Sequence, residues 1–187
     1  MKHKKGFAAV LLTLIISALL SVSAFAASDR FSDVPEASPF YESVTYLAGQ
    51  GITYGTGNGR YAPDTPITVR QWATMICRAF DKEDALSDPA GYGGDACINQ
   101  GYADGWLNLP AMAAPDSRLC RYAIYESGFA AFDIALYSSQ LYPEGENLSS
   151  QDNAFHAAVS FGLCEDTCAG TDIITRGEAA DLLYALL

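Results

Sequence analysis

The residues best suited to binding an anion lie at the predicted start of a helix near the C-terminus. Thr175, Arg176 and Glu178 come directly before an apolar stripe of alanines and leucines. The Thr and Glu side chains are spaced as a capping box. An arginine in the first turn would add a bidentate donor to free backbone amides, which together favour a carboxylate. We therefore predict an anion site here; the alternative is that Arg176 pairs with a nearby acid, Asp172 or Glu178.

A second helix start of this kind is predicted earlier in the chain. Thr68 and Gln71 have the spacing of another capping box, with Arg70 between them. We expect capping to be the main role of the threonine and of its partner at both helix starts. Arg70 is then the side chain of this second segment that is available to a ligand.

The two tryptophans are candidates for stacking on sugar rings. Trp72 belongs to the apolar stripe of the helix that follows Thr68, and is predicted to be core. Trp106 follows Gly105, which ends a helical pattern, and is the tryptophan that we expect to be exposed.

All five cysteines lie beyond residue 26, in the part of the chain that we expect to be exported. Disulfides form and persist in that environment. Cys164 and Cys168 are close enough along the chain to close a small loop, and Cys97 with Cys120 could tie two helices together. The number is odd, which leaves Cys77 as the expected buried thiol.

Motifs for catalysis, metals and cofactors are missing from this sequence. It contains neither G-x-S-x-G nor H-E-x-x-H nor a phosphate-binding glycine loop, and His156 is the one histidine beyond residue 26. The cysteine spacings are not those of zinc knuckles. We therefore expect a protein that is not an enzyme and has no metal or cofactor; a pair of catalytic carboxylates is the alternative left open.

The first 26 residues have the pattern of a secretory signal peptide. Three lysines precede an apolar run, and the small-residue triplet Ala24-Phe25-Ala26 marks a cleavage site. An uncleaved membrane anchor is the alternative; no later stretch is long and apolar enough to span a bilayer. The net charge of −11 argues against nucleic acid as a partner. An anionic ligand would have to be held by a few locally placed arginines.

The elements that position these residues recur with a period in the fifties. An apolar helical face at 40–48 ends at glycines, a loop rich in Gly, Asn, Asp and Pro covers 52–66, and a second helix follows Thr68. The pattern returns at the C-terminus, with a break at Gly162 and a helix start at Thr175. In the middle, Gly105 and Arg118 have the same separation as Gly162 and Thr175. Three helix-loop-helix units are therefore predicted.

Two stretches carry a family resemblance. The first is Phe31-Ser32-Asp33-Val34-Pro35 with the loop from Gly55 to Asp64 and Ile67-Thr68, and the second is Ile174-Thr175-Arg176-Gly177-Glu178. They resemble the F-x-D-V-P opening, the glycine-rich loop with Pro-Asp and the I-T-R-x-E helix start of S-layer homology repeats. We predict repeats at 27–80 (clear), 81–133 (divergent) and 134–187 (partial).

This resemblance implies a mainly α fold, a pseudo-threefold bundle of three repeats with long Gly/Pro-rich loops. It also implies grooves between neighbouring repeats that bind anionic, often pyruvylated, secondary cell-wall polymer. The arginine of the family helix start corresponds to Arg176. The first repeat has Val69 at that position, and the second has Leu119 flanked by Arg118 and Arg121. Asp33 is expected to cap or brace the first helix. The predicted polymer-binding residues are Arg176, Thr175, Glu178, Arg70, Asp33 and Trp106.

Two functions follow from these patterns. The first is a secreted, non-catalytic cell-surface module that binds cell-wall polysaccharide and anchors itself or a partner protein to the envelope, as in an S-layer. The alternative is a disulfide-stabilised extracellular structural or protein-interaction domain that has lost polymer binding. The substituted helix starts of the first two repeats favour the alternative, whereas Thr175 to Glu178 favours the anchor.

Overall fold

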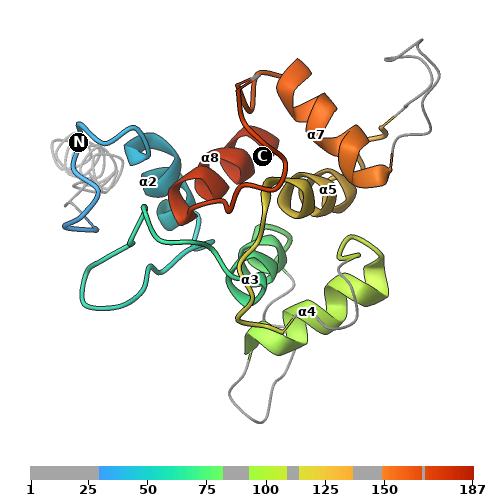
Figure 1. The fold of residues 1–187 in the computed structure, drawn as a ribbon. Coiled ribbons are helices and arrows are strands. Elements are labelled where there is room, and N and C mark those ends of the chain that lie inside the picture. The colour runs from blue at the N-terminus through green and yellow to red at the C-terminus, as the bar shows by residue number, and fades with distance from the viewer. Residues whose placement is uncertain (1–29, 82–92, 109–113, 137–148, 166) are drawn as a thin grey trace, which may run out of the picture. The chain divides into compact units, whose positions relative to one another are not determined.

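Six helices account for the regular structure of the residues that this computed structural model describes (Figure 1), namely 30–81, 93–108, 114–136, 149–165 and 167–187. They are α2 (Tyr41–Gly49), α3 (Val69–Ala79), α4 (Gly93–Asp104), α5 (Arg121–Ala131), α7 (Ser150–Ser160) and α8 (Arg176–Leu186). In these same residues the β-structure is limited to isolated bridges. The mainly α fold predicted from the sequence is therefore confirmed.

Side-chain caps determine where three of these helices begin. Thr68 before α3 and Thr175 before α8 form the predicted capping boxes, with Gln71 and Glu178 as their partners. A further capping box, which the sequence reading did not identify, starts α7 at Ser149. Each box satisfies amide groups that a helix N-terminus leaves unpaired.

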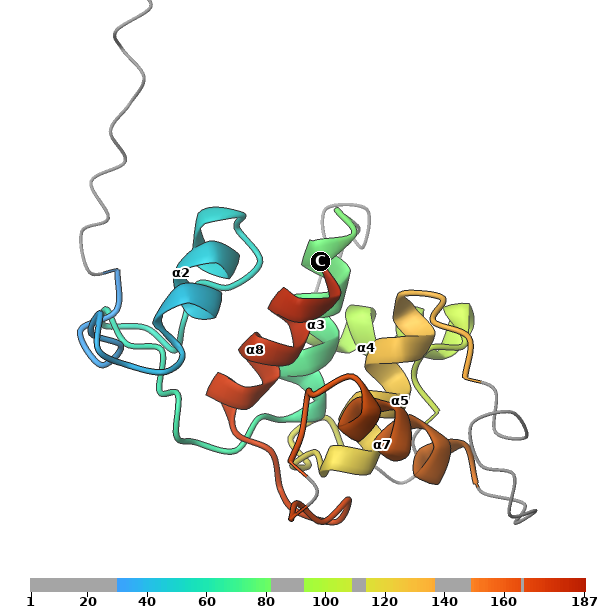
Figure 2. The same ribbon diagram turned by 90° about the horizontal axis from the view of Figure 1, so that it is seen from above.

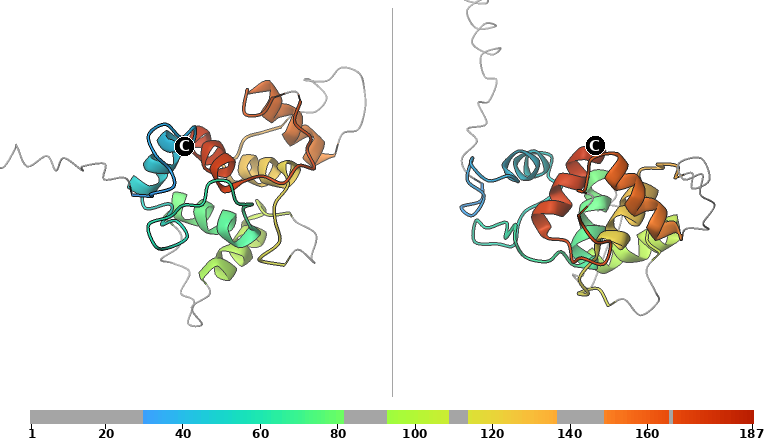
Figure 3. Two further views of the ribbon diagram at one scale, coloured as in Figure 1. Left: turned by 60° about the vertical axis from the view of Figure 1, so that its left-hand side comes forward. Right: turned by 45° about the horizontal axis from the view of Figure 1, so that its top comes forward.

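The helices pack across the predicted repeats. The most extensive helix contacts in the described residues join α3 to α4, α5 to α7 and α2 to α8. Each pair combines the second helix of one repeat with the first helix of the next, and α8 with α2 joins the last repeat to the first (Figures 1 and 2). Figure 3 shows α8 beside α2 and α7 beside α5 from two further directions. The helices of each predicted repeat are therefore buried mainly against helices of its neighbours, as expected for a repeat protein.

A closed cycle of backbone hydrogen bonds joins the three segments that precede α3, α5 and α8. The amide of Ile67 donates to the carbonyl of Ile174 at 3.1 Å, that of Ile174 to Leu119 at 3.0 Å, and that of Leu119 to Ile67 at 3.1 Å. All three side chains are buried. The pseudo-threefold arrangement stays a prediction, and this cycle is the strongest argument for it.

The core lies between the helices that follow these segments. Trp72 on α3 is fully buried, as predicted, and its indole N–H donates to Ser127 Oγ on α5 at 2.9 Å. Tyr125 and Phe129 of α5 belong to the same buried cluster. The indole therefore has the hydrogen-bond partner that a buried tryptophan needs.

Residues 31–187 form one compact unit, in which all six helices lie. The predicted signal peptide, residues 1–26, is outside the described residues. The limits at 27–80, 81–133 and 134–187 stay predictions, and parts of the two connecting segments, 82–92 and 137–148, are also outside them. Within the described part, no helix has the length and apolar character needed to cross a bilayer.

Candidate functional site

Arg176, the main predicted ligand-binding residue, lies in the interior. It is 4% exposed. Its Nε donates to the carbonyl of Tyr61 at 2.8 Å, and its guanidinium lies over the Tyr61 ring, 4.6 Å from the centroid. Burial lowers the pKa of Arg176 and raises the pKa of Tyr61 to about 12. The alternative of a pair between Arg176 and Asp172 or Glu178 is therefore wrong, because within the described residues its side chain bonds to Tyr61.

Thr175 and Glu178 have the capping roles expected for them. Thr175 Oγ1 accepts from the amide of Glu178 at 3.2 Å, and Glu178 Oε2 accepts from the amide of Thr175 at 2.7 Å. Glu178 also receives a hydrogen bond from Arg121 of α5. Burial raises the pKa of Glu178, but the hydrogen bonds from Thr175 and Arg121 outweigh burial and leave the pKa lowered. Glu178 thus links the start of α8 to the start of α5.

The backbone amides at the starts of α3, α5 and α8 are occupied. Those of Arg176 and Gly177 donate to the carbonyls of Thr65 and Pro63 at 2.8 and 2.9 Å. The first two amides of α3 and α5 donate in the same way to other loops: Val69 to Ser117, Arg70 to Pro115, Arg121 to Asp172 and Tyr122 to Gly170. The prediction that free amides here help to bind a carboxylate is therefore wrong, because loop carbonyls already accept from them.

The middle helix start lies two residues later than the sequence register predicted. Leu119 belongs to the hydrogen-bond cycle and so corresponds to Ile174, whereas Arg121 is the first residue of α5, as Arg176 is of α8. Arg121, and not Leu119, is therefore the counterpart of Arg176. The matched spacing from Gly105 misplaced it, since the loop after Gly105 is two residues longer than the loop after Gly162.

Arg70 lies nearer the surface than Arg176 or Arg121. Its side chain is 28% exposed and forms ion pairs with Asp95, at the start of α4, and with Asp116, at 3.3 Å. The Asp116 side chain is 80% exposed. Arg70 is thus a partly accessible cation whose present partners are surface carboxylates.

Asp33 braces the glycine-rich loop and not the first helix. Its carboxylate accepts from the amides of Tyr61 and Ala62 at 2.8 and 2.9 Å, and from Arg60 Nε at 3.3 Å. Burial raises the pKa of Asp33, but these hydrogen bonds outweigh it and leave the pKa lowered. The expected role at the first helix is corrected accordingly: Asp33 holds the loop residue, Tyr61, on which Arg176 stacks.

Trp106 is buried, with 6% of its surface exposed, so the predicted exposure is wrong. The reason is Gly101 on α4: a Cβ atom there would lie 2.8 Å from the indole ring. Because residue 101 has no side chain, the ring packs directly on the helix backbone.

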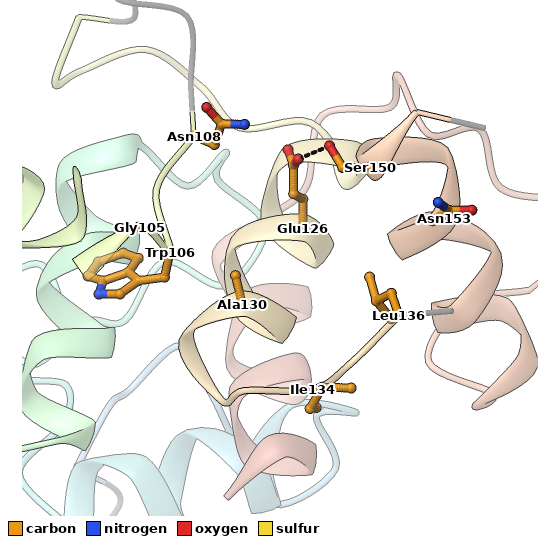
Figure 4. Close-up of a pocket in the computed structure, with 9 residues that line it drawn as sticks. All are labelled: Gly105, Trp106, Asn108, Glu126, Ala130, Ile134, Leu136, Ser150 and Asn153. Carbon is orange, nitrogen blue, oxygen red and sulfur yellow. Dashed lines mark hydrogen bonds between the residues drawn. The ribbon is translucent and has the colours of Figure 1, made fainter. Parts of the chain in front are cut away.

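A cavity of about 270 Å³ lies next to Trp106, between α5 and α7 (Figure 4). Its lining combines an apolar wall with four polar side chains: Gly105, Trp106, Asn108, Glu126, Ala130, Ile134, Leu136, Ser150 and Asn153. Ser150 donates a hydrogen bond to Glu126 across the two helices. Sequence reasoning does not find Asn108, Glu126 or Asn153, because single residues of these types form no motif.

The structure holds the five cysteines as thiols, so neither predicted disulfide is formed in it. Cys97 lies against Cys77, whose Sγ is 4.0 Å from the Cys97 carbonyl. The Cys97–Cys120 bond stays a prediction, and the helix contacts do not favour it, because the extensive contacts of α4 are with α3. Cys164 forms a side-chain hydrogen bond with Cys168. Burial, and to a lesser extent this hydrogen bond, raises the pKa of Cys164 to about 11.

Among the described residues, no group of three or more His, Cys, Asp or Glu side chains is arranged to hold a metal ion.

Comparison with known proteins identifies part of the chain. It is 32% identical over 84 residues to a cell surface protein of Thermoanaerobacter kivui, an alignment that covers 45% of this chain and 11% of that protein. The chain thus spans about a tenth of the length of this relative. Residues 30–68 match the S-layer homology domain. This segment contains Asp33, Tyr61 and the cap residue Thr68. For residues 30–68, this match confirms the resemblance to S-layer homology repeats that the sequence shows.

Proposed function

We propose that this protein is a non-catalytic cell-surface module that binds anionic cell-wall polymer, including pyruvylated polymer, and anchors itself or a partner protein to the bacterial envelope. The observation that carries the proposal is the match of residues 30–68 to the S-layer homology domain. The cell-surface relative supports the location.

The predicted polymer-binding residues divide into two groups in this proposal. Arg176, Thr175, Glu178 and Asp33 act indirectly: they hold the helix starts and the glycine-rich loop in place. Arg70 and Trp106 border the accessible surface and the cavity. In a chain with a net charge of −11, direct contact with an anion depends on an arginine that can exchange its partner.

Arg70 meets that requirement. Surface ion pairs of its kind contribute only about 0–1 kcal/mol each, so a polymer carboxylate can replace Asp95 or Asp116 at little cost. A planar guanidinium also accommodates the two oxygens of a pyruvyl carboxylate. We propose Arg70 as the residue that contacts the anionic group directly.

The test is co-sedimentation of the protein with cell-wall sacculi from its host, before and after chemical removal of pyruvyl groups. We expect Arg70→Ala to weaken binding at least fivefold. Asp95→Asn, which removes one of the two carboxylate partners of Arg70, should strengthen binding. Asp133→Asn is the matched control, because it changes the net charge equally at an exposed residue beyond the far end of α5.

Two results would contradict the proposal. Absence of wild-type sedimentation would favour the alternative, an extracellular structural or protein-interaction domain. Equal gains from Asp95→Asn and Asp133→Asn would show that net charge, and not Arg70, controls binding. Arg176→Ala is unsuitable for this test, since loss of its buried contacts would reduce binding by destabilising the fold.

A further inference from the structure

The cavity beside Trp106 exists because two bulky side chains of the first repeat have small counterparts in the second. Tyr54 is the third residue after Gly51, the positive-φ glycine that follows α2, and Asn108 is the third after Gly105, the positive-φ glycine that follows α4. Ala130 is likewise the counterpart of Arg78. Arg78 lies 11 positions after Ile67, and Ala130 lies 11 positions after Leu119, the equivalent member of the hydrogen-bond cycle. In the first repeat, the Arg78 guanidinium stacks on the Tyr54 ring at 4.6 Å.

In the second repeat, Asn108 and Ala130 line the open space of about 270 Å³ instead (Figure 4). Ligand pockets for drug-sized molecules are roughly 300–1,000 Å³. The cavity is therefore suited to one small ring and not to a longer oligosaccharide.

The lining favours a neutral ligand with several hydroxyl groups. Asn108 brings a side-chain amide to the lining, and Asn153 Oδ1 is a buried acceptor without a partner among the described residues. A buried polar atom left unpaired is costly, so a donor that reaches this amide is favoured. Glu126 adds a second acceptor, and Trp106 contributes to the apolar wall against which a sugar ring packs.

An anionic ligand fits this lining poorly. Among the described residues that line the cavity, none is Lys, Arg or His, and Glu126 supplies a carboxylate. A second carboxylate brought into a partly buried site next to Glu126 would be repelled. The pocket thus differs in chemistry from the surface around Arg70.

We propose that the cavity between α5 and α7 is a binding site for one neutral pyranose unit, held by Asn108, Asn153 and Glu126. The inference deepens the proposed function and rests on it for its natural ligand, because a wall polymer consists of sugar units. The polymer would then be held at two places, with an anionic group at Arg70 and a neutral sugar in the cavity.

The test is NMR titration of the protein with glucose, galactose, N-acetylglucosamine and N-acetylmannosamine, and with glucuronate as the anionic probe. We expect at least one neutral sugar to shift the signals of the Trp106 indole and of the Asn108 and Asn153 amides. Glucuronate should bind at least tenfold more weakly. Shifts with glucuronate equal to those with the neutral sugars, or no shifts with any neutral sugar, would overturn the proposal.

Two variants test the location. The double variant Asn108→Tyr with Ala130→Arg introduces the pair that fills the corresponding space in the first repeat, and should weaken sugar binding at least tenfold. Asn153→Leu should do the same by removing the amide. Ala103→Arg is the control, because it places an arginine on an exposed alanine of α4 outside the cavity, and should bind as the wild type does. Unchanged binding by folded cavity variants would overturn the proposed site.

Sedimentation on sacculi separates this inference from the proposed function. A wild-type protein that binds walls but none of the neutral sugars would contradict the cavity site alone. A protein that binds a neutral sugar in the cavity but does not sediment with walls would contradict the anchoring function and leave the pocket as a sugar site.

Discussion

Tyr61 and Arg176 hold each other through reciprocal hydrogen bonds, although 115 positions separate them in the chain. Arg176 Nε donates to the Tyr61 carbonyl at 2.8 Å, and the Tyr61 hydroxyl donates to the Arg176 carbonyl at 3.0 Å. The guanidinium also stacks on the ring. Because Tyr61 belongs to the glycine-rich loop before α3 and Arg176 to the start of α8, this pair joins the first predicted repeat to the last.

Removing either side of this pair should destabilise the protein to different extents. Arg176→Ala leaves the buried Tyr61 carbonyl without its donor and removes the stacking, so we expect a loss of about 2–4 kcal/mol in unfolding free energy. Tyr61→Phe removes one hydroxyl and should cost about 1 kcal/mol. Urea denaturation of each variant measures these losses. Arg60→Ala, at a side chain that is 65% exposed, is the control and should change stability little. A loss of stability in Arg60→Ala as large as that in Arg176→Ala would contradict the stabilising role of the Tyr61–Arg176 pair.

Alkaline pH should weaken the same contact. Burial raises the pKa of Tyr61 from 10.0 to about 12. The protonated Tyr61 side chain therefore makes its full contribution to the free energy of unfolding below pH 10. Between about pH 10 and 12, the unfolded state releases the tyrosine proton more readily than the folded state, and stability falls. We expect Tyr61→Phe to show a smaller fall over this range. Denaturation midpoints measured at intervals from pH 9 to 12 test this, and identical slopes in both proteins would contradict it.

Local patterns were sufficient to predict the capped starts of α3 and α8, but not the start of α5 or the helix pairs. Thr68 and Thr175 cap the helices that the sequence predicts, because a capping box depends on residues within one turn. The pairing of α3 with α4 and of α8 with α2 depends on contacts between distant segments, for which the sequence carries no short-range signal. The predicted Cys97–Cys120 pair depends on such contacts, and the extensive contacts of α4 with α3 do not favour it.

In the candidate site, too, local features were predictable from the sequence and contacts between distant residues were not. Sequence spacing correctly placed Arg176 in the first turn of a helix, but it did not predict the burial of this side chain, because its partner Tyr61 lies in a distant loop. The cavity beside Trp106 could not be predicted from the sequence either. The cavity lies where Asn108 and Ala130 replace the larger pair Tyr54 and Arg78. This correspondence is found only when the segments are aligned by their backbone hydrogen bonds.

Two glycines should respond to alanine in opposite directions. A Cβ atom at Gly177 would lie 2.5 Å from the Phe40 ring, so Gly177→Ala should destabilise by about 1–3 kcal/mol, the typical cost of overpacking. Gly49, at the end of α2, has no atom within 4 Å of a Cβ, and Gly49→Ala should stabilise by about 0.5–1 kcal/mol. Thermal melts compare the two variants. Phe40→Leu should partly restore Gly177→Ala, and failure to do so would exclude the ring as the cause.

Acid should weaken the link between α5 and α8. The pKa of Glu178 is lowered, so its contribution to stability is present above about pH 4.5 and is lost as the pH falls through the folded-state pKa. Glu178→Gln keeps the cap, as Gln71 does before α3, but removes the ion pair with Arg121. We expect the variant to be less stable by about 1–2 kcal/mol at pH 7, because it leaves the largely buried Arg121 poorly neutralised. The difference should shrink below pH 4.5.

Urea midpoints at pH 7, 5 and 3 measure that effect, and Glu36→Gln, at an exposed residue, is the control. A gap between wild type and Glu178→Gln that stays constant down to pH 3 would show that the cap, and not the ion pair, is the source of the difference.

Cysteine labelling should distinguish the thiol pairs. Cys77 and Cys97 are buried against each other between α3 and α4, so in the reduced protein they should react with iodoacetamide only on unfolding. Cys164 should react more slowly than Cys168 at pH 8, because its pKa is raised to about 11 and little of it is thiolate. If the exported protein is oxidised, the contacts favour Cys77–Cys97 and Cys164–Cys168, which leaves Cys120 as the odd thiol. Peptide mapping without reductant tests this: alkylated Cys120 is the expected result, whereas a linked Cys97–Cys120 peptide would require a rearrangement of α4 relative to α5.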